Sequence, residues 1–240
     1  KEDKNTVVAV YPPNHFYNKN LKILPLSGVA NSRTIHCNES GYYSIYQSDR
    51  YGFNNPDSEW DKNDIEYFLI GDSYVHGACV NRPNDISSNL RKISKKNVLN
   101  TGMSSSGSLI HYASLKEYLP QNTKKVLWFF YEGNELMNLN EEIKNPILFR
   151  YFSDYNFLQN LKDKQNLIDK ISLNLIEKKY KKEIQGQKKQ FFKLFRTRQK
   201  ILHKAQESKT KIDDSKLLNF EKIFKQGIQF TRENKSKMYV

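Results

Sequence analysis

The fold of this chain is decided by residues 66–77, which read Glu66-Tyr67-Phe68-Leu69-Ile70-Gly71-Asp72-Ser73-Tyr74-Val75-His76-Gly77. The apolar run that opens this stretch and ends at a glycine predicts a buried strand of a parallel sheet. Gly71 lets the backbone turn sharply, so Ser73 falls just past the carboxyl end of the strand, where open α/β sheets bind their ligands. Taken alone, these residues more commonly form an ordinary Gly-Asp-Ser turn.

Two later stretches have the same form. Residues 97–102 predict a second short strand that leads into a glycine loop, and residues 125–131 predict a third strand that ends in a polar run. Apolar residues recur at helical spacing in 85–95 and 108–118, which predicts a helix after each of the first two strands. Alternating strands and helices are typical of a doubly wound α/β sheet. Right-handed crossovers then bring the three strand ends to one edge.

In their order and spacing, these blocks resemble the SGNH (GDSL-like) hydrolase superfamily over roughly residues 40–145. The Gly-Asp-Ser block of that family is matched at Ser73, its second-block glycine at Gly102, and its Gly-x-Asn-Asp block loosely at 132–135, with Asn134 at the asparagine. The resemblance implies a three-layer α/β/α flavodoxin-like fold with a mostly parallel sheet. It also implies that Ser73 is the nucleophile and that Ser73, Gly102 and Asn134 form the oxyanion hole. Neither a cofactor nor a metal is expected.

The catalytic base of the family lies in a C-terminal Asp-x-x-His block, which this sequence does not contain. A serine hydroxyl is a poor nucleophile until a base removes its proton. Residues 237–240 look like the start of a further core strand, so the chain reads as a C-terminally truncated fragment with little esterase activity of its own. Among the five histidines, His76 follows Ser73 by three residues and is interpreted either as a site-lining residue or as local structure.

Several polar residues are predicted to surround the serine. The run 48–57, which has Gly and Pro punctuation, resembles a lead-in found in a bacterial SGNH subgroup associated with surface-polysaccharide systems. It is either a loop that covers the edge of the first core strand or part of the substrate approach, since loops are frequent sites of function. The predicted site-lining residues are Asp49, Arg50, Asn54, Asp72, His76 and Glu135.

The chain divides into four predicted parts: an N-terminal lead-in with edge strands (1–60), an SGNH-like core (61–145), a long basic helical insertion (146–235) and the start of a strand (236–240). Residues 21–26 and 41–46 are the predicted strands of the first part. Long helices are predicted at 158–182 and 188–206 in the third.

The net charge of +13 lies almost entirely in the last third of the chain. Residues 151–240 contain 22 basic and 10 acidic residues, a formal charge of +12. One interpretation is contact with an anionic polysaccharide or a membrane surface, and the other is a solvated helix face. Nucleic acid is not expected as a partner, because no recognition motif accompanies the charge. No apolar run is long enough to predict a membrane span.

The two cysteines, Cys37 and Cys79, flank segments that should converge near Ser73. They are expected to form either a disulfide or two buried free thiols. A disulfide would favour an extracytoplasmic (periplasmic or membrane-associated) location.

The resemblance implies a serine esterase that acts on a carbohydrate ester, most simply an O-acetyl group. Three alternatives stay open: a non-catalytic carbohydrate-binding or scaffold protein that keeps the fold, an O-acetyltransferase, and a lipid esterase with a helical lid.

Overall fold

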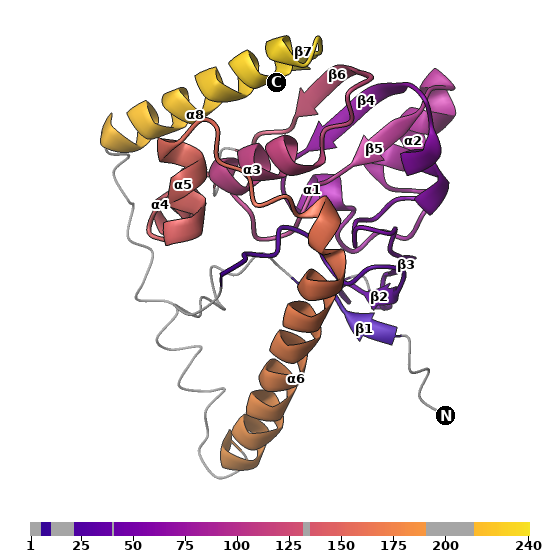
Figure 1. The fold of residues 1–240 in the computed structure, drawn as a ribbon. Coiled ribbons are helices and arrows are strands. Elements are labelled where there is room, and N and C mark those ends of the chain that lie inside the picture. The colour runs from indigo at the N-terminus through magenta and orange to yellow at the C-terminus, as the bar shows by residue number, and fades with distance from the viewer. Residues whose placement is uncertain (1–5, 11–21, 40, 132–134, 191–213) are drawn as a thin grey trace.

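The computed structural model describes residues 6–10, 22–39, 41–131, 135–190 and 214–240, without the side chains of 135–136, 179–190 and 214–216 (Figure 1). At its centre is a four-stranded sheet in the order β5-β4-β6-β7, and every neighbouring pair of strands is parallel. These strands are β4 (Ile65–Ile70), β5 (Val98–Asn100), β6 (Thr123–Trp128) and β7 (Lys237–Tyr239). The predicted α/β class with a mostly parallel sheet is therefore confirmed. The strand expected at 237–240 is β7, which pairs with β6.

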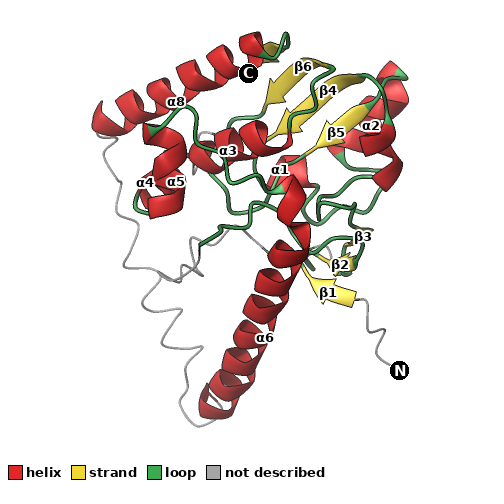
Figure 2. Cartoon of the chain, viewed as in Figure 1, coloured by secondary structure: helices red, strands yellow, loops and turns green. Residues whose placement is uncertain are grey.

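Apolar side chains on both faces explain why β4 lies inside the sheet. Phe68, Leu69 and Ile70 are fully buried, and successive side chains of a strand point to opposite faces. Phe68 and Ile70 belong to the large core, whereas Leu69 packs in a smaller cluster with Val75 and Val98. Helices therefore cover both faces of the sheet (Figure 2).

The smaller cluster is covered by α2 (Ile86–Ser94), whose Ile86 and Leu90 pack against it. Asp85 caps this helix, because its carboxylate accepts a hydrogen bond from the Ser88 N–H at 2.9 Å. Ile93, which was predicted to share the buried face, is 80% exposed. Ile93 lies in the last turn of the helix, where Arg91 contacts the sheet by donating to the Val98 carbonyl.

On the other face, α3 (Ser108–Tyr118) is buried along its whole length, although its sequence predicted a single apolar face. Its neighbours are α4 (Glu135–Ile143), α5 (Pro146–Ser153) and α8 (Asp214–Glu233), which contact it in addition to the sheet. Leu148, Tyr151 and Ile223 of these helices lie in the same core cluster as Phe68. The segment predicted as an insertion thus contributes to the main hydrophobic core.

The buried carboxylate of Glu142 closes the amino end of α3. It accepts hydrogen bonds from the backbone N–H groups of Gly107, Leu109 and Ile110, which otherwise lack partners at a helix start. Burial raises the pKa of Glu142 to about 7, while these three donors oppose the rise. The packing of α4 on α3 therefore depends on a titratable group.

We expect Glu142 to make a contribution to the free energy of unfolding that falls as the pH rises from about 4.5 to about 7, by at most about 1.4 kcal/mol per pH unit. The sign follows because the folded state keeps the Glu142 proton to a higher pH than the unfolded chain does. Urea denaturation across this range measures the slope of the whole protein, to which the buried histidines contribute with the opposite sign. Glu142→Gln should shift this slope upward by the Glu142 contribution. Glu141→Gln, which changes an exposed carboxylate on the same helix, is the matched control. Equal slopes in all three proteins would contradict this role.

The N-terminal strands form a sheet of their own, not the predicted edges of the main sheet. They are β1 (Thr6–Val8), β2 (Arg33–Ile35) and β3 (Ile45–Gln47), with β1 parallel and β3 antiparallel to β2. A short 3-10 helix, η1 (Asp57–Asp61), follows. The described residues 22–26, predicted as strand, are irregular, because Gln159 takes up both backbone groups of Leu24.

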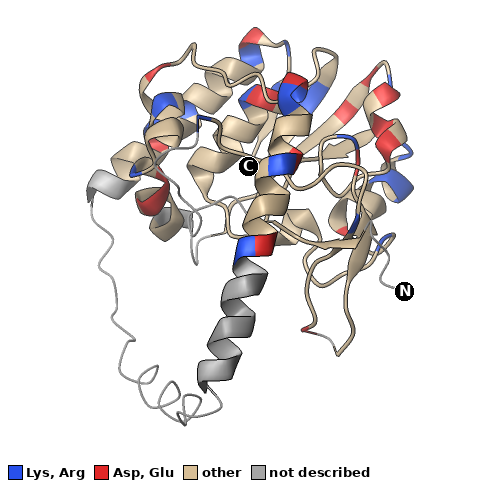
Figure 3. Ribbon diagram, turned by 60° about the horizontal axis from the view of Figure 1, so that its bottom comes forward, with Lys and Arg blue, Asp and Glu red and all other residues tan. Residues whose placement is uncertain are grey.

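The basic part of the chain includes a second 3-10 helix, η2 (Lys162–Lys164), and α6 (Gln165–Gln190), which projects from the body (Figure 1). The helix predicted at 158–182 therefore begins later, and most of the one predicted at 188–206 lies outside the described residues. Figure 3 shows acidic residues interspersed with the basic ones on the described helices. Residues 179–213, whose side chains are not described, contain 12 basic and 3 acidic residues. Within the described part, no helix is long and apolar enough to cross a membrane.

Candidate active site

A pocket of about 410 Å³ lies where the segments after three parallel strands meet. Ser73 follows β4, Ser105 follows β5 and Tyr131 follows β6, so the predicted convergence of strand ends at one edge is confirmed. The segment between β2 and β3 also contributes lining residues. The described lining residues are His36, Cys37, Glu39, Asp72, Ser73, Tyr74, Ala78, Cys79, Ser104, Ser105 and Tyr131.

Ser73 is the first residue of a single helical turn, α1 (Ser73–His76). The Asp72 carboxylate caps this turn by accepting the Tyr74 N–H at 3.0 Å, and burial raises the pKa of Asp72. Gly71 is needed before the turn, since a Cβ there would lie 2.5 Å from a methyl group of Val75. The Ser73 side chain is half-buried and lines the pocket. Asp72 and Ser73, both predicted as site residues, thus line the same pocket.

The structure gives Gly102 a different role from the one predicted. Its backbone N–H donates to Asn100 Oδ1 at 2.8 Å, so it is not available to an oxyanion. A Cβ at Gly102 would lie 2.6 Å from Val75 and 2.7 Å from the His76 nitrogen. Glycine is therefore required here for the close approach of the β5 end to α1, and the prediction of Gly102 as an oxyanion donor is wrong.

Ser105, three residues later, is the better candidate. It lines the pocket, and its backbone has a left-handed φ of 61°, a conformation uncommon outside glycine and often found at functional sites. Within the described part of the chain, the N–H groups of Ser73 and Ser105 have no hydrogen-bond acceptor. Two backbone donors of this kind can stabilise an oxyanion.

Ser104, which lines the pocket, forms hydrogen bonds with two histidines, His36 and His76. Its backbone N–H donates to His76 Nδ1 at 3.1 Å, so the proton of the neutral ring is on Nε2 and is directed to the Tyr46 hydroxyl at 3.0 Å. The Ser104 hydroxyl lies 2.9 Å from His36 Nε2. Burial lowers the pKa of His36 to about 4 and that of His76 well below its usual value, so both rings are neutral at pH 7.

His76 is fully buried and is not part of the pocket lining. The prediction that it lines the site is therefore wrong, and the local-structure interpretation is correct. Among the described residues, none forms a hydrogen bond with the Ser73 hydroxyl. His36 does line the pocket, but its Nε2 is engaged by Ser104.

Asp49 is buried inside its own loop and not at the pocket. Oδ1 accepts the backbone N–H groups of Tyr51 and Phe53, and Oδ2 accepts Asn55 Nδ2 and Trp60 Nε1. Burial raises the pKa of Asp49 to about 6 against these four donors. The carboxylate organises the loop that leads into β4, so its prediction as a site-lining residue is wrong.

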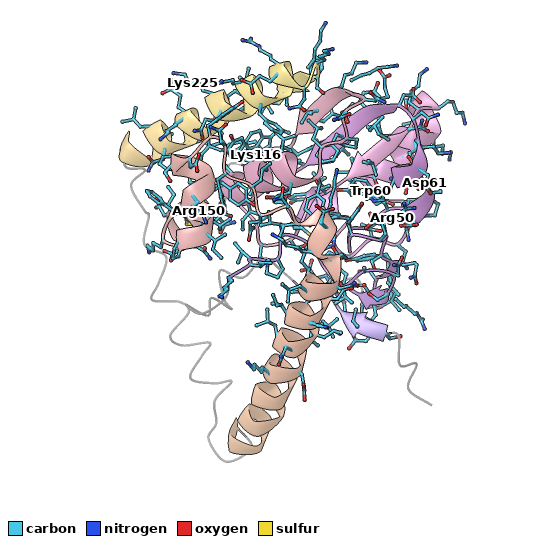
Figure 4. All side chains as sticks on the ribbon, viewed as in Figure 1. Arg50, Trp60, Asp61, Lys116, Arg150 and Lys225 are labelled. Atoms are coloured by element: carbon cyan, nitrogen blue, oxygen red, sulfur yellow. A yellow bond between two sulfur atoms is a disulfide. The ribbon has the colours of Figure 1, made fainter. Side chains whose placement is uncertain are left out.

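Arg50 and Asn54 are also absent from the pocket lining, which corrects their predicted role. Arg50 pairs on the surface with Asp57 and Asp61, each at 2.7 Å. These two carboxylates raise the pKa of Arg50. Arg50 and Asp61 are labelled in Figure 4. Asn54 is buried and donates from Nδ2 to the His76 carbonyl at 2.9 Å, which supports the end of α1 from behind.

The third predicted oxyanion donor, Asn134, lies outside the described residues, as does the side chain of Glu135 at the start of α4. Tyr131, just before this gap, belongs to the pocket. The segment after β6 therefore reaches the site, and the roles of Asn134 and Glu135 stay predictions.

Cys37 and Cys79 form a disulfide, with their Cα atoms 5.2 Å apart. Of the two predicted states, the disulfide is thus the one present. Both cysteines line the pocket. The bridge ties the segment after β2, which contains His36 and Glu39, to the segment after α1.

Several site residues were missed by sequence reasoning, namely His36, Glu39, Tyr74, Ser104, Ser105 and Tyr131. The run of three serines at 104–106 after a predicted strand was the clearest available signal for two of them. His36 and Glu39 could have been found through the disulfide, since they flank Cys37. Among the residues described, no group of three or more His, Cys, Asp or Glu is arranged to hold a metal ion.

The chain matches no protein-family model, no curated protein and no solved structure.

Proposed function

We propose that Ser73 is the nucleophile of an SGNH-type serine esterase that removes a short acyl group, an acetyl, from a carbohydrate hydroxyl. The observation that carries this proposal is the place of Ser73, at the start of a capped turn after β4 and in a pocket reached from three strand ends. The order of the Gly-Asp-Ser, glycine-loop and Gly-x-Asn blocks supports the same superfamily.

The pocket lining favours a small acyl group over a lipid chain. Ala78 provides the only aliphatic side chain among the described lining residues, and most of the others are polar or aromatic. A long acyl chain gains about 0.8 kcal/mol for each CH₂ group that it buries, and this lining offers it little apolar surface. A lipid esterase is therefore the weaker alternative.

In the proposed reaction, the Ser73 oxygen attacks the carbonyl carbon of the ester while its proton passes to a base. The carbonyl oxygen becomes an oxyanion that accepts hydrogen bonds from the N–H groups of Ser73 and Ser105. Each such donor is worth roughly 3–4 kcal/mol. The bond to the sugar oxygen then breaks, the sugar oxygen takes a proton from the base, and water later hydrolyses the acetyl-serine.

The component that the described residues do not supply is the base. Since no described side chain accepts the Ser73 proton and His36 is held by Ser104, the hydroxyl stays protonated at neutral pH. We expect the 240-residue chain to hydrolyse p-nitrophenyl acetate slowly and to be rescued by added imidazole, which can enter the pocket as a diffusible base. In the presence of imidazole, the rate of the wild-type chain should exceed that of Ser73→Ala by about tenfold or more. This factor is smaller than the usual effect of a positioned general base, roughly 10²–10⁴-fold.

Mass spectrometry of the rescued reaction should find an acetyl group on the peptide that contains Ser73. The control is Ser58→Ala, which removes an exposed serine hydroxyl in η1 and should behave as the wild-type chain does. If Ser73→Ala and the wild-type chain respond equally to imidazole, the esterase proposal fails. The Ser73 hydroxyl, to which no described residue forms a hydrogen bond, would then favour the second candidate, a carbohydrate-binding protein that keeps the fold without the chemistry.

A further inference from the structure

We propose that Tyr74 and Tyr131 form an aromatic subsite that binds an uncharged sugar ring beside Ser73. This inference deepens the proposed function and rests on it for the nature of the substrate. Both tyrosines line the pocket, and their ring centroids are 5.7 Å apart at an interplanar angle of 60°. They come from different segments, Tyr74 from α1 and Tyr131 from the segment after β6.

The exposure of these rings indicates a ligand. The Tyr74 side chain is 63% exposed and that of Tyr131 45%, although each ring is large enough to contribute substantially to a core. A single exposed apolar side chain needs no explanation, but two rings in contact at a pocket form an apolar surface of the kind that marks a binding site. A tyrosine offers an apolar ring face together with a polar hydroxyl. A pyranose ring is complementary, since its C–H face can stack on the aromatic ring while its hydroxyls form hydrogen bonds.

The charged groups of the pocket select against acidic sugars. Glu39 and Asp72 both line it, and no Lys or Arg is among its described lining residues. Carboxylates accept hydrogen bonds from sugar hydroxyls, whereas they repel a carboxylated or sulfated ring. The pocket therefore favours an uncharged sugar. The anionic polysaccharide considered as a partner on account of the overall positive charge does not fit here.

Binding to the Ser73→Ala chain tests the subsite without turnover. The probes are partially acetylated xylo-, manno- and gluco-oligosaccharides, which are neutral, and partially acetylated oligogalacturonate, which is acidic. Isothermal titration calorimetry at physiological salt should show at least one neutral probe binding about tenfold more tightly than the acidic one. Tyr74→Ala and Tyr131→Ala should each weaken that binding by about tenfold, while Tyr74→Phe should stay within about threefold.

The matched control is Tyr239→Ala, which removes a tyrosine of similar exposure (47%) on β7, outside the pocket lining. Glu39→Gln should reduce the preference for neutral probes. The subsite is overturned if no neutral probe binds, if the acidic probe binds equally well, or if both alanine variants bind as before. Acetylation of Ser73 by p-nitrophenyl acetate needs no sugar. A chain that is acetylated but does not bind sugar would therefore refute the subsite alone, and the reverse result would refute the esterase alone.

Discussion

Loss of the Cys37–Cys79 disulfide is expected to lower the free energy of unfolding by about 4 kcal/mol, a large share of the stability of a typical domain. The two cysteines are 42 residues apart, so the bridge closes a long loop and restricts the unfolded chain substantially. Urea denaturation of the oxidised protein and of Cys37→Ala/Cys79→Ala measures the difference.

Reduction with dithiothreitol provides the control for this prediction. It should bring the wild-type chain to the stability of the double variant and leave the double variant unchanged. A difference below about 1 kcal/mol would show that the bridge constrains little beyond what the hydrophobic core already fixes.

The same substitution should also weaken binding at the pocket, because the bridge holds the segment that contains His36 and Glu39 against the one that follows α1. A disulfide at this position favours an extracytoplasmic location, since such bonds persist in oxidising compartments.

The sheet was predictable because β4, β5 and β6 each contain a short apolar run, and such runs can be read from a sequence. Even the strand predicted from the few residues at 237–240 is present as β7, and the structure shows that it pairs with β6. The predictions of the helices were less accurate. The burial of α3 on all sides depends on α4, α5 and α8, and no single-helix pattern contains that information.

The candidate site was predictable at the level of segments but not of atoms. Ser73 was found because its neighbours in the chain define its turn. Gly102 was misassigned because a sequence does not reveal that its N–H is taken by Asn100. His76 was misplaced for a related reason, since it is the last residue of the single turn α1 and its imidazole is fully buried.

Asp49, in the segment that leads into β4, was also misassigned, because a sequence does not distinguish a buried structural carboxylate from a site residue. We expect Asp49→Ala to cost about 4 kcal/mol of folding free energy. The substitution leaves at least two fully buried donors, the Phe53 N–H and Asn55 Nδ2, without this acceptor, at about 1–3 kcal/mol each. The donors of Tyr51 and Trp60, which are only partly buried, lose it as well.

Asp49→Asn distinguishes the hydrogen bonds that Oδ1 accepts from those that Oδ2 accepts. Its amide oxygen can still accept the two backbone N–H groups now held by Oδ1, but its amide nitrogen would face the donors of Asn55 and Trp60. The loss should therefore be about 2 kcal/mol, measured by urea denaturation beside Asp49→Ala. At a temperature where both variants are folded, each should bind the neutral oligosaccharide as the parent chain does, because the carboxylate does not reach the pocket. Weakened sugar binding with unchanged stability would restore Asp49 to the substrate site.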